Sequence, residues 1–584
     1  MKLNTFFKAK YLVILSAALV FGSCTKLNEV VLDEVLGQNA SSPTGALAAA
    51  YDRLGKGTFV DHGGVFALQE YTTDEALLAT RGSDWGDGGK WRSMHEFTWA
   101  PDNAIVTDNW NMLTNGITRS LTAIREISNS NVPQKEVYLA EAKALLAYYT
   151  FTTLDLFGQA PYRNPLEENA ALEIKQSAST IDELILQVEG LIPTLAALGE
   201  QSTHNGRFTK EAAYGLLANM YLNRAVFKDR YAATFNFNEK SVNSNDTDMD
   251  KVIYYTSLLI NSPKFHLATN YFDSFSINNS GGSELIWAIT QKIDMIRNGS
   301  NSFGYVGVER NQRPSPKNRG TNAACVSPQF YASWDGNHED PRFSRKYQYA
   351  DGTWFTNDAE GSVPASDVVA GTTLPWFHFN RGIMVGQQYG PKLTPAGNFE
   401  MVGNRIKVSE LYMEKSAGTK MNFTPELNFS NPAQAVFSQD QINRGARVFK
   451  FEYDPGDGNG SSNVDIPLFR LGVMYTLRAE AYFRKGLTGQ ALSDINLLRT
   501  SRTREAYHNN APGTAIGSID EATLYKEMAF ESYWEMYRRP QMIRFGKFEL
   551  PFSAKPTTQP FRRIFPIPQT TLDVSKEFRQ NLGY

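Results

Sequence analysis

The sequence has few cysteines, no long hydrophobic run and no excess of basic charge, and each of these absences excludes a class of protein. Only two cysteines, Cys24 and Cys325, occur among 584 residues, which is too few for a disulfide framework or a four-thiolate zinc site. No stretch of the chain approaches the roughly 18 consecutive apolar residues of a transmembrane helix. With 58 basic against 61 acidic side chains, nucleic acid is not expected as a partner.

Recognisable catalytic and metal-binding motifs are also missing. The seven histidines do not show the His-Glu-x-x-His spacing of zinc hydrolases, and no Gly-x-Ser-x-Gly nucleophile motif occurs. The glycine-rich run 456–460 lacks the Lys-Ser/Thr of a phosphate loop and is interpreted as a solvent turn. The alternating Asp246, Asp248 and Asp250 lack the glycine and closing glutamate of a calcium loop, so we interpret them as a polar linker that caps the next helix. We expect no catalytic residue, no metal and no cofactor.

The first residues have the pattern of an export signal. Three lysines precede an apolar run over 11–21, which is too short to span a bilayer but suits the core of a signal peptide. The segment ends in Phe21-Gly22-Ser23-Cys24, which resembles a bacterial lipobox. We therefore expect residues 1–23 to be removed and Cys24 to carry the lipid anchor; the alternative is an ordinary signal peptide cut at Ser23. Removal leaves 55 basic against 61 acidic side chains, a net charge of −6.

Helical patterning dominates both ends of the chain. Residues 136–157 predict a long, almost fully buried helix, because they are rich in Ala and Leu and are closed by Gly158 and Pro161. Residues 209–227 predict a second helix. The spacing of small and large residues in Tyr475–Leu498 matches a tetratricopeptide unit, and its first-helix spacing recurs from Tyr214 to Tyr221, with the second helix of that unit expected at 250–261. We predict a mainly α fold built on a tetratricopeptide-like helical repeat scaffold.

The middle of the chain differs from its ends. From about Asn270 to Asp465 the sequence is rich in Gly, Pro, Asn and Ser and has few sustained helical patterns, although Glu284–Gln291 suits a strand or a brief helix. We predict a long, loop-rich inserted region with minor β structure. The regions expected are a signal peptide (1–23), an N-terminal helical region (24–269) with an aromatic loop at about 55–115, a variable ligand-binding region (270–465) and a C-terminal helical region (466–584).

Aromatic residues make up 12% of the chain, and eight of the nine tryptophans lie in or beside the irregular zones. Rings on loops can stack on sugar rings while neighbouring polar groups bind the hydroxyls. The segment 80–92 has this character, because Trp85 and Trp91 stand among glycines and charged residues. The alternative is that these rings pack the loops onto the helical core, and the sequence leaves both interpretations open.

Several segments, taken in their order along the chain, resemble one family. The runs Ile564–Gln569 and Gln580–Tyr584 resemble the closing signature of the SusD/RagB family of outer-membrane nutrient-binding lipoproteins. The other family-like segments are the lipobox at Cys24 and the stretches Glu141–Tyr162, Phe208–Tyr221, Asp340–Arg342, Pro467–Gly486 and Glu527–Gly546. The resemblance covers essentially the whole chain, and we interpret Glu535–Arg544 within it as structural.

The resemblance implies a lipoprotein that binds nutrients without catalysis on the outer face of the outer membrane of Bacteroidota-type bacteria. The implied partner is a SusC-like TonB-dependent barrel, over which the lipoprotein acts as a hinged lid. Glycans are the commonest ligands of the family and peptides serve a minority branch. One departure concerns export, because the first acidic residue after the cysteine is Glu29. Calcium occurs in the family, but no loop of this sequence supports a metal site.

The resemblance also gives candidate ligand-binding residues. The stretch Arg81–Trp91 resembles the aromatic-containing binding loop of glycan-binding members, which nominates Arg81, Asp84, Trp85 and Trp91. Tyr305 and Trp334 lie in the region where the second part of the family's site usually lies. The function expected is capture of oligosaccharides or polysaccharides and their delivery to the transporter. A peptide-binding protein of the same architecture and an outer-membrane glycosidase are the alternatives.

Overall fold

The structure is a computed structural model that describes residues 42–292, 302–355, 358–454, 462–503 and 511–584. Cys24, the predicted signal peptide and the predicted turn at 456–460 lie outside the described residues. Pro43–Tyr584 forms one compact unit.

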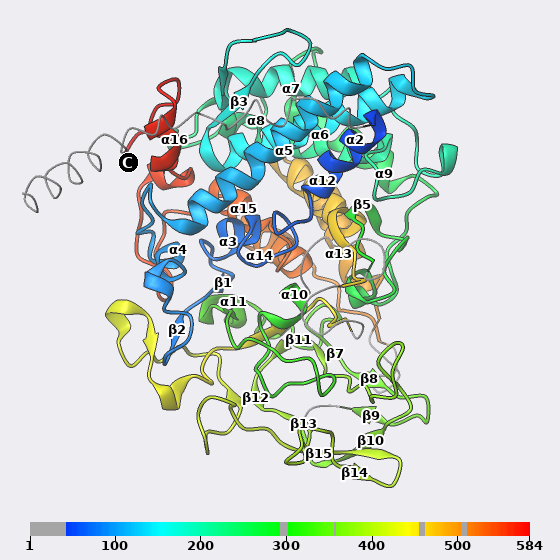
Figure 1. Ribbon diagram of the computed structural model, residues 1–584, viewed down its shortest axis with the longest axis vertical. Coiled ribbons are helices and arrows are strands. Elements are labelled where there is room, and N and C mark those ends of the chain that lie inside the picture. Colours follow the sequence, from blue (N-terminus) through cyan, green and yellow to red (C-terminus); the bar gives the residue numbers. More distant parts are fainter. Residues whose placement is uncertain (1–41, 293–301, 356–357, 455–461, 504–510) are drawn as a thin grey trace, which may run out of the picture. The chain divides into compact units, whose positions relative to one another are not determined.

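Long helices from the first half of the chain pack side by side in one region of this unit (Figure 1). Helices α5 (Ala104–Ser128) and α6 (Lys135–Phe157) form a helical hairpin, α2 (Pro43–Asp52) packs against α5, and α7 (Ser177–Leu191) contacts α6. Helix α6 confirms the helix predicted for 136–157 and is buried on nearly all sides. It ends at Gly158, whose φ of 71° is a conformation that glycine adopts without strain.

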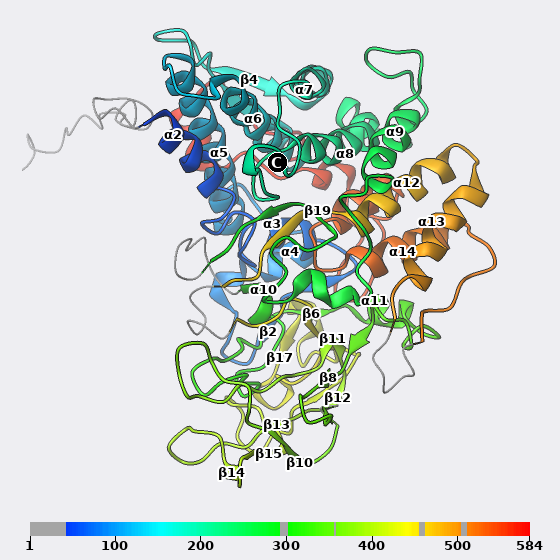
Figure 2. The ribbon, with the colours of Figure 1, turned by 90° about the vertical axis from the view of Figure 1, so that its right-hand side faces the viewer.

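Two helical pairs correspond to the predicted tetratricopeptide units. Helix α8 (Lys210–Lys228) packs on α9 (Asp248–Ile260), and α12 (Leu471–Arg484) packs on α13 (Thr488–Thr500). Because α12 also contacts α9 and α14 (Glu521–Ser532), the two pairs adjoin, as Figure 2 shows. Thr247 and Asp250 form a capping box at the start of α9, which confirms the cap predicted for the aspartate-rich linker.

Short strands from the middle of the chain gather at the other end of the unit (Figure 1). Strand β15 (Arg405–Glu410) pairs antiparallel with β10 (Gly361–Pro364), β13 (Tyr389–Pro391) and β14 (Met401–Val402). Strand β11 (Arg381–Met384) pairs with β7 (Ser344–Arg345) and β18 (Arg447–Phe449). These strands surround a second hydrophobic cluster, separate from the main core. The predicted loop-rich region with minor β structure is confirmed.

The remaining helices and strands are short: α3 (Val65–Glu70), α4 (Arg92–Glu96), α10 (Ser302–Tyr305), α11 (Pro328–Ser333), α15 (Arg538–Arg544), α16 (Gln569–Val574), β1 (Ala76–Leu77), β2 (Thr80–Arg81), β3 (Gln159–Tyr162), β4 (Glu173–Gln176), β6 (Cys325–Val326), β8 (Tyr347–Gln348), β9 (Trp354–Phe355), β12 (Gly386–Gln387), β16 (Asn422–Phe423) and β17 (Val436–Phe437). Helices α3, α4 and α5 occupy much of 55–115, where the sequence predicts a glycine-rich irregular zone. Cys325 is a fully buried free thiol in β6 and packs as a small apolar side chain.

One antiparallel strand pair ties the middle of the chain to the helical scaffold. Strand β5 (Leu285–Ile289), within the ambiguous segment 284–291, pairs with β19 (Ile466–Arg470). Strand β19 leads directly into α12, so the beginning and the end of the loop-rich region meet beside the tetratricopeptide-like pairs.

Buried ion pairs surround this junction. Arg470 contacts Glu284 at 2.8 Å, Glu531 at 2.7 Å and Glu535 at 2.8 Å, and Arg502 contacts Glu284 and Glu531 at 2.9 and 2.8 Å. These side chains are at most 1% exposed. The two arginines lower the pKa of Glu284 to about 2, although burial alone raises it. The carboxylate therefore stays charged at neutral pH.

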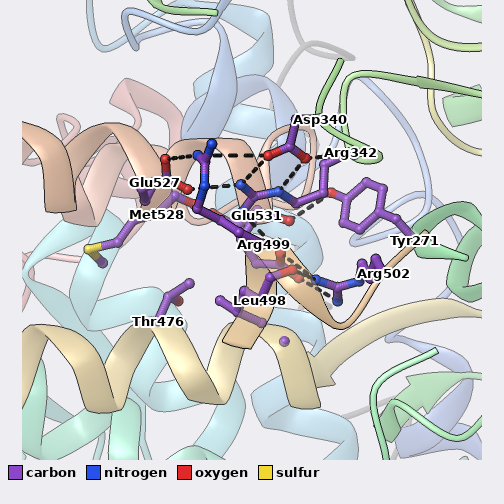
Figure 3. Close-up of polar contacts among 12 residues, drawn as sticks. Tyr271, Asp340, Arg342, Thr476, Leu498, Arg499, Arg502, Glu527, Met528 and Glu531 are labelled. Carbon is purple, nitrogen blue, oxygen red and sulfur yellow. Dashed lines mark hydrogen bonds and ion pairs between the residues drawn. The ribbon is translucent and has the colours of Figure 1, made fainter. Parts of the chain in front are cut away.

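A second part of the network begins in the family-like segment Asp340–Arg342. Arg342 contacts Asp340 and Glu527 at 2.8 Å each and Glu531 at 3.5 Å (Figure 3). Arg499 of α13 also contacts Glu527 at 2.5 Å. Since Glu531 reaches both Arg342 and Arg502, the network is continuous from the loop-rich region to α13 and α14. Removing one member leaves the others charged and buried, which is strongly unfavourable.

We predict that Glu531→Gln lowers the free energy of unfolding by about 3–5 kcal/mol, because it removes one carboxylate from three buried arginines. Thermal and urea unfolding measure the effect. Glu400→Gln is the control, since Glu400 pairs with Lys392 and Lys407 at the surface and its loss should change stability little. Equal stability of Glu531→Gln and the wild type would show that the network does not hold the fold.

Candidate functional site

The candidate aromatic loop begins at a parallel strand pair. Strand β2 pairs with β17, and the chain then turns through Gly82 and Trp85 into the short helical turn Asp87–Gly89. Trp85 has a φ of 61°, a left-handed conformation that is unusual for a bulky residue and costs on the order of 1–3 kcal/mol. The surrounding contacts must therefore hold the Trp85 side chain in place.

Those contacts come from the backbone and from two rings. The Trp85 indole N–H donates to the carbonyl oxygen of Thr321 at 3.1 Å. Its ring meets the edges of Trp91 and His62, with centroids 5.9 and 5.5 Å away. Trp85 keeps part of its surface exposed, whereas Trp91 is buried and its indole N–H donates to Asp87 at 2.7 Å. Trp91 therefore packs beneath Trp85 as a buried residue and is not itself exposed to solvent.

Charged groups gather around Asp84, the residue that precedes Trp85 in the chain. Asp84 contacts Arg310 at 3.0 Å and Lys415 at 2.5 Å. The Asp84 and Arg310 side chains are each 16% exposed and that of Lys415 is 40% exposed. A partly exposed aromatic residue that follows a carboxylate paired with two cations offers both an apolar face and hydrogen-bonding groups to a ligand.

Tyr305, in α10, is linked to this loop through its backbone. The carbonyl oxygen of Tyr305 accepts a hydrogen bond from the backbone N–H of Thr321 at 3.2 Å, and the Thr321 carbonyl binds Trp85. The Tyr305 ring is half-buried and lies 5.9 Å from the ring of Tyr453. The structure therefore places Asp84 and Trp85 in one loop and joins the Tyr305 backbone to that loop through Thr321, while the Tyr305 ring packs against the second hydrophobic cluster.

Two other nominated residues are buried away from any surface. Arg81 is 1% exposed and donates to the carbonyl oxygens of Ala323, Ile442 and Arg444 at 3.0, 3.1 and 2.7 Å. Trp334 is fully buried and stacks on Phe530 with centroids 3.5 Å apart. Neither side chain presents a face to a ligand, and Trp91 is 6% exposed, so we leave these three out of the proposed binding surface.

Most tryptophans prove to be packing residues. Only Trp85 and Trp354 keep partial exposure, and the buried ones are Trp91, Trp99, Trp110, Trp287, Trp334, Trp376 and Trp534. Burial rather than exposure therefore holds for seven of the nine rings. Trp110 lies within helix α5 rather than on an irregular segment, and Trp376 packs in the second hydrophobic cluster rather than on the helical core.

Sequence reasoning missed several residues at the site. His62, Arg310, Thr321 and Lys415 come from segments far apart in the chain, and no local pattern marks any of them. Within the described residues, no group of three or more His, Cys, Asp or Glu is arranged to hold a metal ion. Among the helices that the structure describes, none is long and apolar enough to cross a bilayer.

Glu309 supports the segment that carries Lys415. Its carboxylate accepts backbone N–H bonds from Asn311 at 2.6 Å and from Glu414 at 3.1 Å, while Lys415 contacts Asp84. Burial raises the pKa of Glu309 to about 7, although the two N–H bonds favour its charged form. The Glu309 carboxylate therefore gains or loses its proton near neutral pH, which changes its hydrogen bonds to Asn311 and Glu414.

Two family profiles match the chain. One, described as starch-binding and associating with the outer membrane, matches residues 55–222, and the other, described as the SusD family, matches residues 283–584. The chain belongs to the SusD family. The family resemblance predicted from the closing signature and the other ordered segments is thereby confirmed.

Individual members of the SusD family are similar over nearly the whole chain. The starch-binding protein SusD of Bacteroides thetaiotaomicron is 24% identical over 540 residues, covering 89% of this chain and 85% of that protein. A laminarin-binding SusD-like protein matches in structure with a TM-score of 0.61 at 16% identity, covering 94% of this chain and 100% of the other. Surface glycan-binding protein A of B. thetaiotaomicron, in complex with laminarihexaose, matches with a TM-score of 0.57 at 16% identity, covering 92% and 98%. These structures confirm the predicted tetratricopeptide-like fold.

We predict that Glu309→Gln changes the pH dependence of stability. The folded-state pKa of Glu309 lies above that of a free glutamate, about 4.3, so its stabilising contribution is present below that value and is lost as the pH rises through about 7. As the pH rises from about 5 to about 8.5, the wild type should therefore lose roughly 2–3 kcal/mol of unfolding free energy that the variant does not lose. Urea unfolding at both pH values measures this. Glu400→Gln should show no such change, and a parallel pH profile for Glu309→Gln and the wild type would contradict the assignment.

Proposed function

We propose that this SusD-family protein is a cell-surface lipoprotein that binds oligosaccharide or polysaccharide nutrients and delivers them to a SusC-like TonB-dependent transporter. The proposal includes lipidation at Cys24, location at the outer membrane facing the extracellular side, and binding without catalysis. The observation that carries it is the partly exposed Trp85, held in a strained conformation beside Asp84, Arg310 and Lys415.

The chemistry of this surface suits a sugar. A pyranose ring has an apolar face that packs against an indole, and its hydroxyls are at once donors and acceptors. Asp84 supplies an acceptor, and Lys415 and Arg310 supply donors; Tyr305 remains a candidate second ring, since its backbone is joined to the loop through Thr321. The related proteins named for starch, laminarin and laminarihexaose support glucans as the first ligands to test.

We predict that Trp85→Ala weakens glucan binding by about tenfold or more, because burial of a large aromatic ring contributes about 1.5–3 kcal/mol. Calorimetric titration of the purified protein with laminarihexaose and maltohexaose measures the effect. Tyr254→Ala is the matched control, since Tyr254 is 55% exposed on α9 and belongs to the helical scaffold.

The outcomes separate the candidate functions. If a sugar binds and Trp85→Ala leaves its affinity unchanged, the site assignment is wrong. If no sugar binds but a peptide does, the peptide-binding alternative replaces this proposal. Release of shorter sugars by the purified protein would instead indicate a glycosidase.

We predict that Cys24→Ala moves the protein from the membrane fraction to the soluble fraction, because the lipid attached to Cys24 is its proposed anchor. Metabolic labelling with a palmitate analogue should mark the wild type and not the variant. Labelling of both, or membrane retention of the variant, would contradict the proposed anchor.

A further inference from the structure

A second candidate site lies in the strand-rich part of the chain. A cavity of about 770 Å³ opens beside the second hydrophobic cluster, within the range of about 300–1,000 Å³ that is usual for small-molecule sites. The side chains that matter for its chemistry are Arg345, Tyr347, Asp367, His378, Arg381 and Glu452. None of its lining residues belongs to the group around Trp85.

One wall of the cavity is a rigid aromatic pair. Tyr347 and His378 stack with centroids 3.5 Å apart and planes 10° from parallel. Both bind the same oxygen of Asp367: the Tyr347 hydroxyl donates to Oδ2 at 2.9 Å, and His378 Nε2 lies 2.8 Å from it. Three side chains are thereby fixed in one arrangement while each keeps some exposed surface.

The Asp367 carboxylate keeps an acceptor for a ligand. Its side chain is 33% exposed, and the hydrogen bonds that it accepts from Tyr347 and His378 both use Oδ2, so Oδ1 can accept from a ligand. The hydrogen bond from His378 lowers the pKa of Asp367, so the group is a carboxylate at neutral pH.

Arg381 supplies a buried donor to the same cavity. It is 7% exposed, and its Nε and Nη2 donate to the carbonyl oxygen of Lys450, with Nη2 also reaching that of Phe275 at 3.1 Å. Its remaining nitrogen, Nη1, lies 3.7 Å from Glu452 Oε2, which is beyond hydrogen-bond distance. The same Glu452 oxygen, Oε2, accepts a hydrogen bond from the backbone N–H of Ile277 at 2.9 Å.

The balance of charge indicates the class of ligand. The cationic lining residues Arg345, Lys346 and Arg381 are matched by the anionic residues Asp273, Asp367 and Glu452, and Arg345 already pairs with Asp273 at 2.8 Å. A phosphate or another highly charged ligand would find no excess of opposite charge among these lining residues. A neutral ligand with several hydroxyls can accept from a guanidinium, donate to a carboxylate and pack against a ring.

We propose that this cavity is a second sugar-binding site, which holds units of an oligosaccharide through Asp367, Arg381 and the Tyr347–His378 pair. This inference rests on the proposed function, because it assumes that the protein binds glycans. It adds a location, in the loop-rich region, that is independent of the aromatic loop around Trp85.

Calorimetric titration with laminarihexaose and maltohexaose tests the proposal in a Trp85→Ala background. We expect the single variant to retain a binding event, and the double variants Trp85→Ala/Asp367→Asn and Trp85→Ala/Tyr347→Ala to weaken that event by at least about tenfold. Tyr254→Ala in the same background is the control and should leave it unchanged. Val368→Trp is a further variant for the case that the others unfold. Val368 lines the cavity and is 50% exposed, so a larger side chain there narrows the cavity without removing an internal contact.

The results distinguish this inference from the function on which it rests. If the wild type binds sugar, Trp85→Ala abolishes all binding and the single variants Asp367→Asn, Tyr347→Ala and Val368→Trp bind as the wild type does, the second site is refuted while the proposed function stands. Residual binding in Trp85→Ala that the cavity variants do not weaken also refutes it. If the wild type binds neither sugar, the proposed function fails for these glucans and the second site fails with it.

Discussion

The buried ion pairs around Arg342, Arg470 and Arg502 are the constraint on which the rest of the fold depends. Their carboxylate partners come from the start of β5, from the loop-rich region and from α14, which are far apart in the chain. A single charge at this burial is costly unless its partners are present, so each segment stabilises the others only when all are in place. The helical scaffold and the loop-rich region are therefore energetically coupled, and the main hydrophobic cluster also includes loop-rich residues such as Phe330, Trp334 and Phe343.

The candidate binding loop is attached to this framework through a short series of contacts. Helix α15 follows α14, and its Arg538 pairs with Asp74 at 2.6 Å, while Tyr525 of α14 donates to the same carboxylate at 2.8 Å. Asp74 lies just before β1, which pairs with β6, and β2 then pairs with β17 before the chain reaches Trp85. The strained φ of Trp85 is thus maintained by contacts on both sides of the loop, and the ring is held in position before a ligand arrives.

The sequence predicted the scaffold well because helices are specified locally. Helices α6, α8, α9, α12 and α13 follow from periodicity, caps and repeat spacing, all within one segment. The site could be predicted only in part. Asp84 and Trp85 share one loop and only the backbone of Tyr305 is joined to it, Arg310 and Lys415 have no local signal, and Arg81 is buried with carbonyl partners from residues 323, 442 and 444.

The tryptophans show why composition and loop position are not enough to locate a binding surface. Burial of an aromatic side chain is favourable as long as the backbone around it keeps its hydrogen bonds. A ring on an irregular segment that contacts the core is therefore more stable buried than exposed to water. Partial exposure of a ring therefore needs specific contacts, and at Trp85 the indole N–H donates to the carbonyl oxygen of Thr321. Tyr347 follows the same rule, since its hydroxyl is committed to Asp367 and one ring face to His378 while the residue stays partly exposed. Fixed polar contacts around a partly exposed ring, rather than the number of rings, are the feature on which both proposed binding surfaces rest.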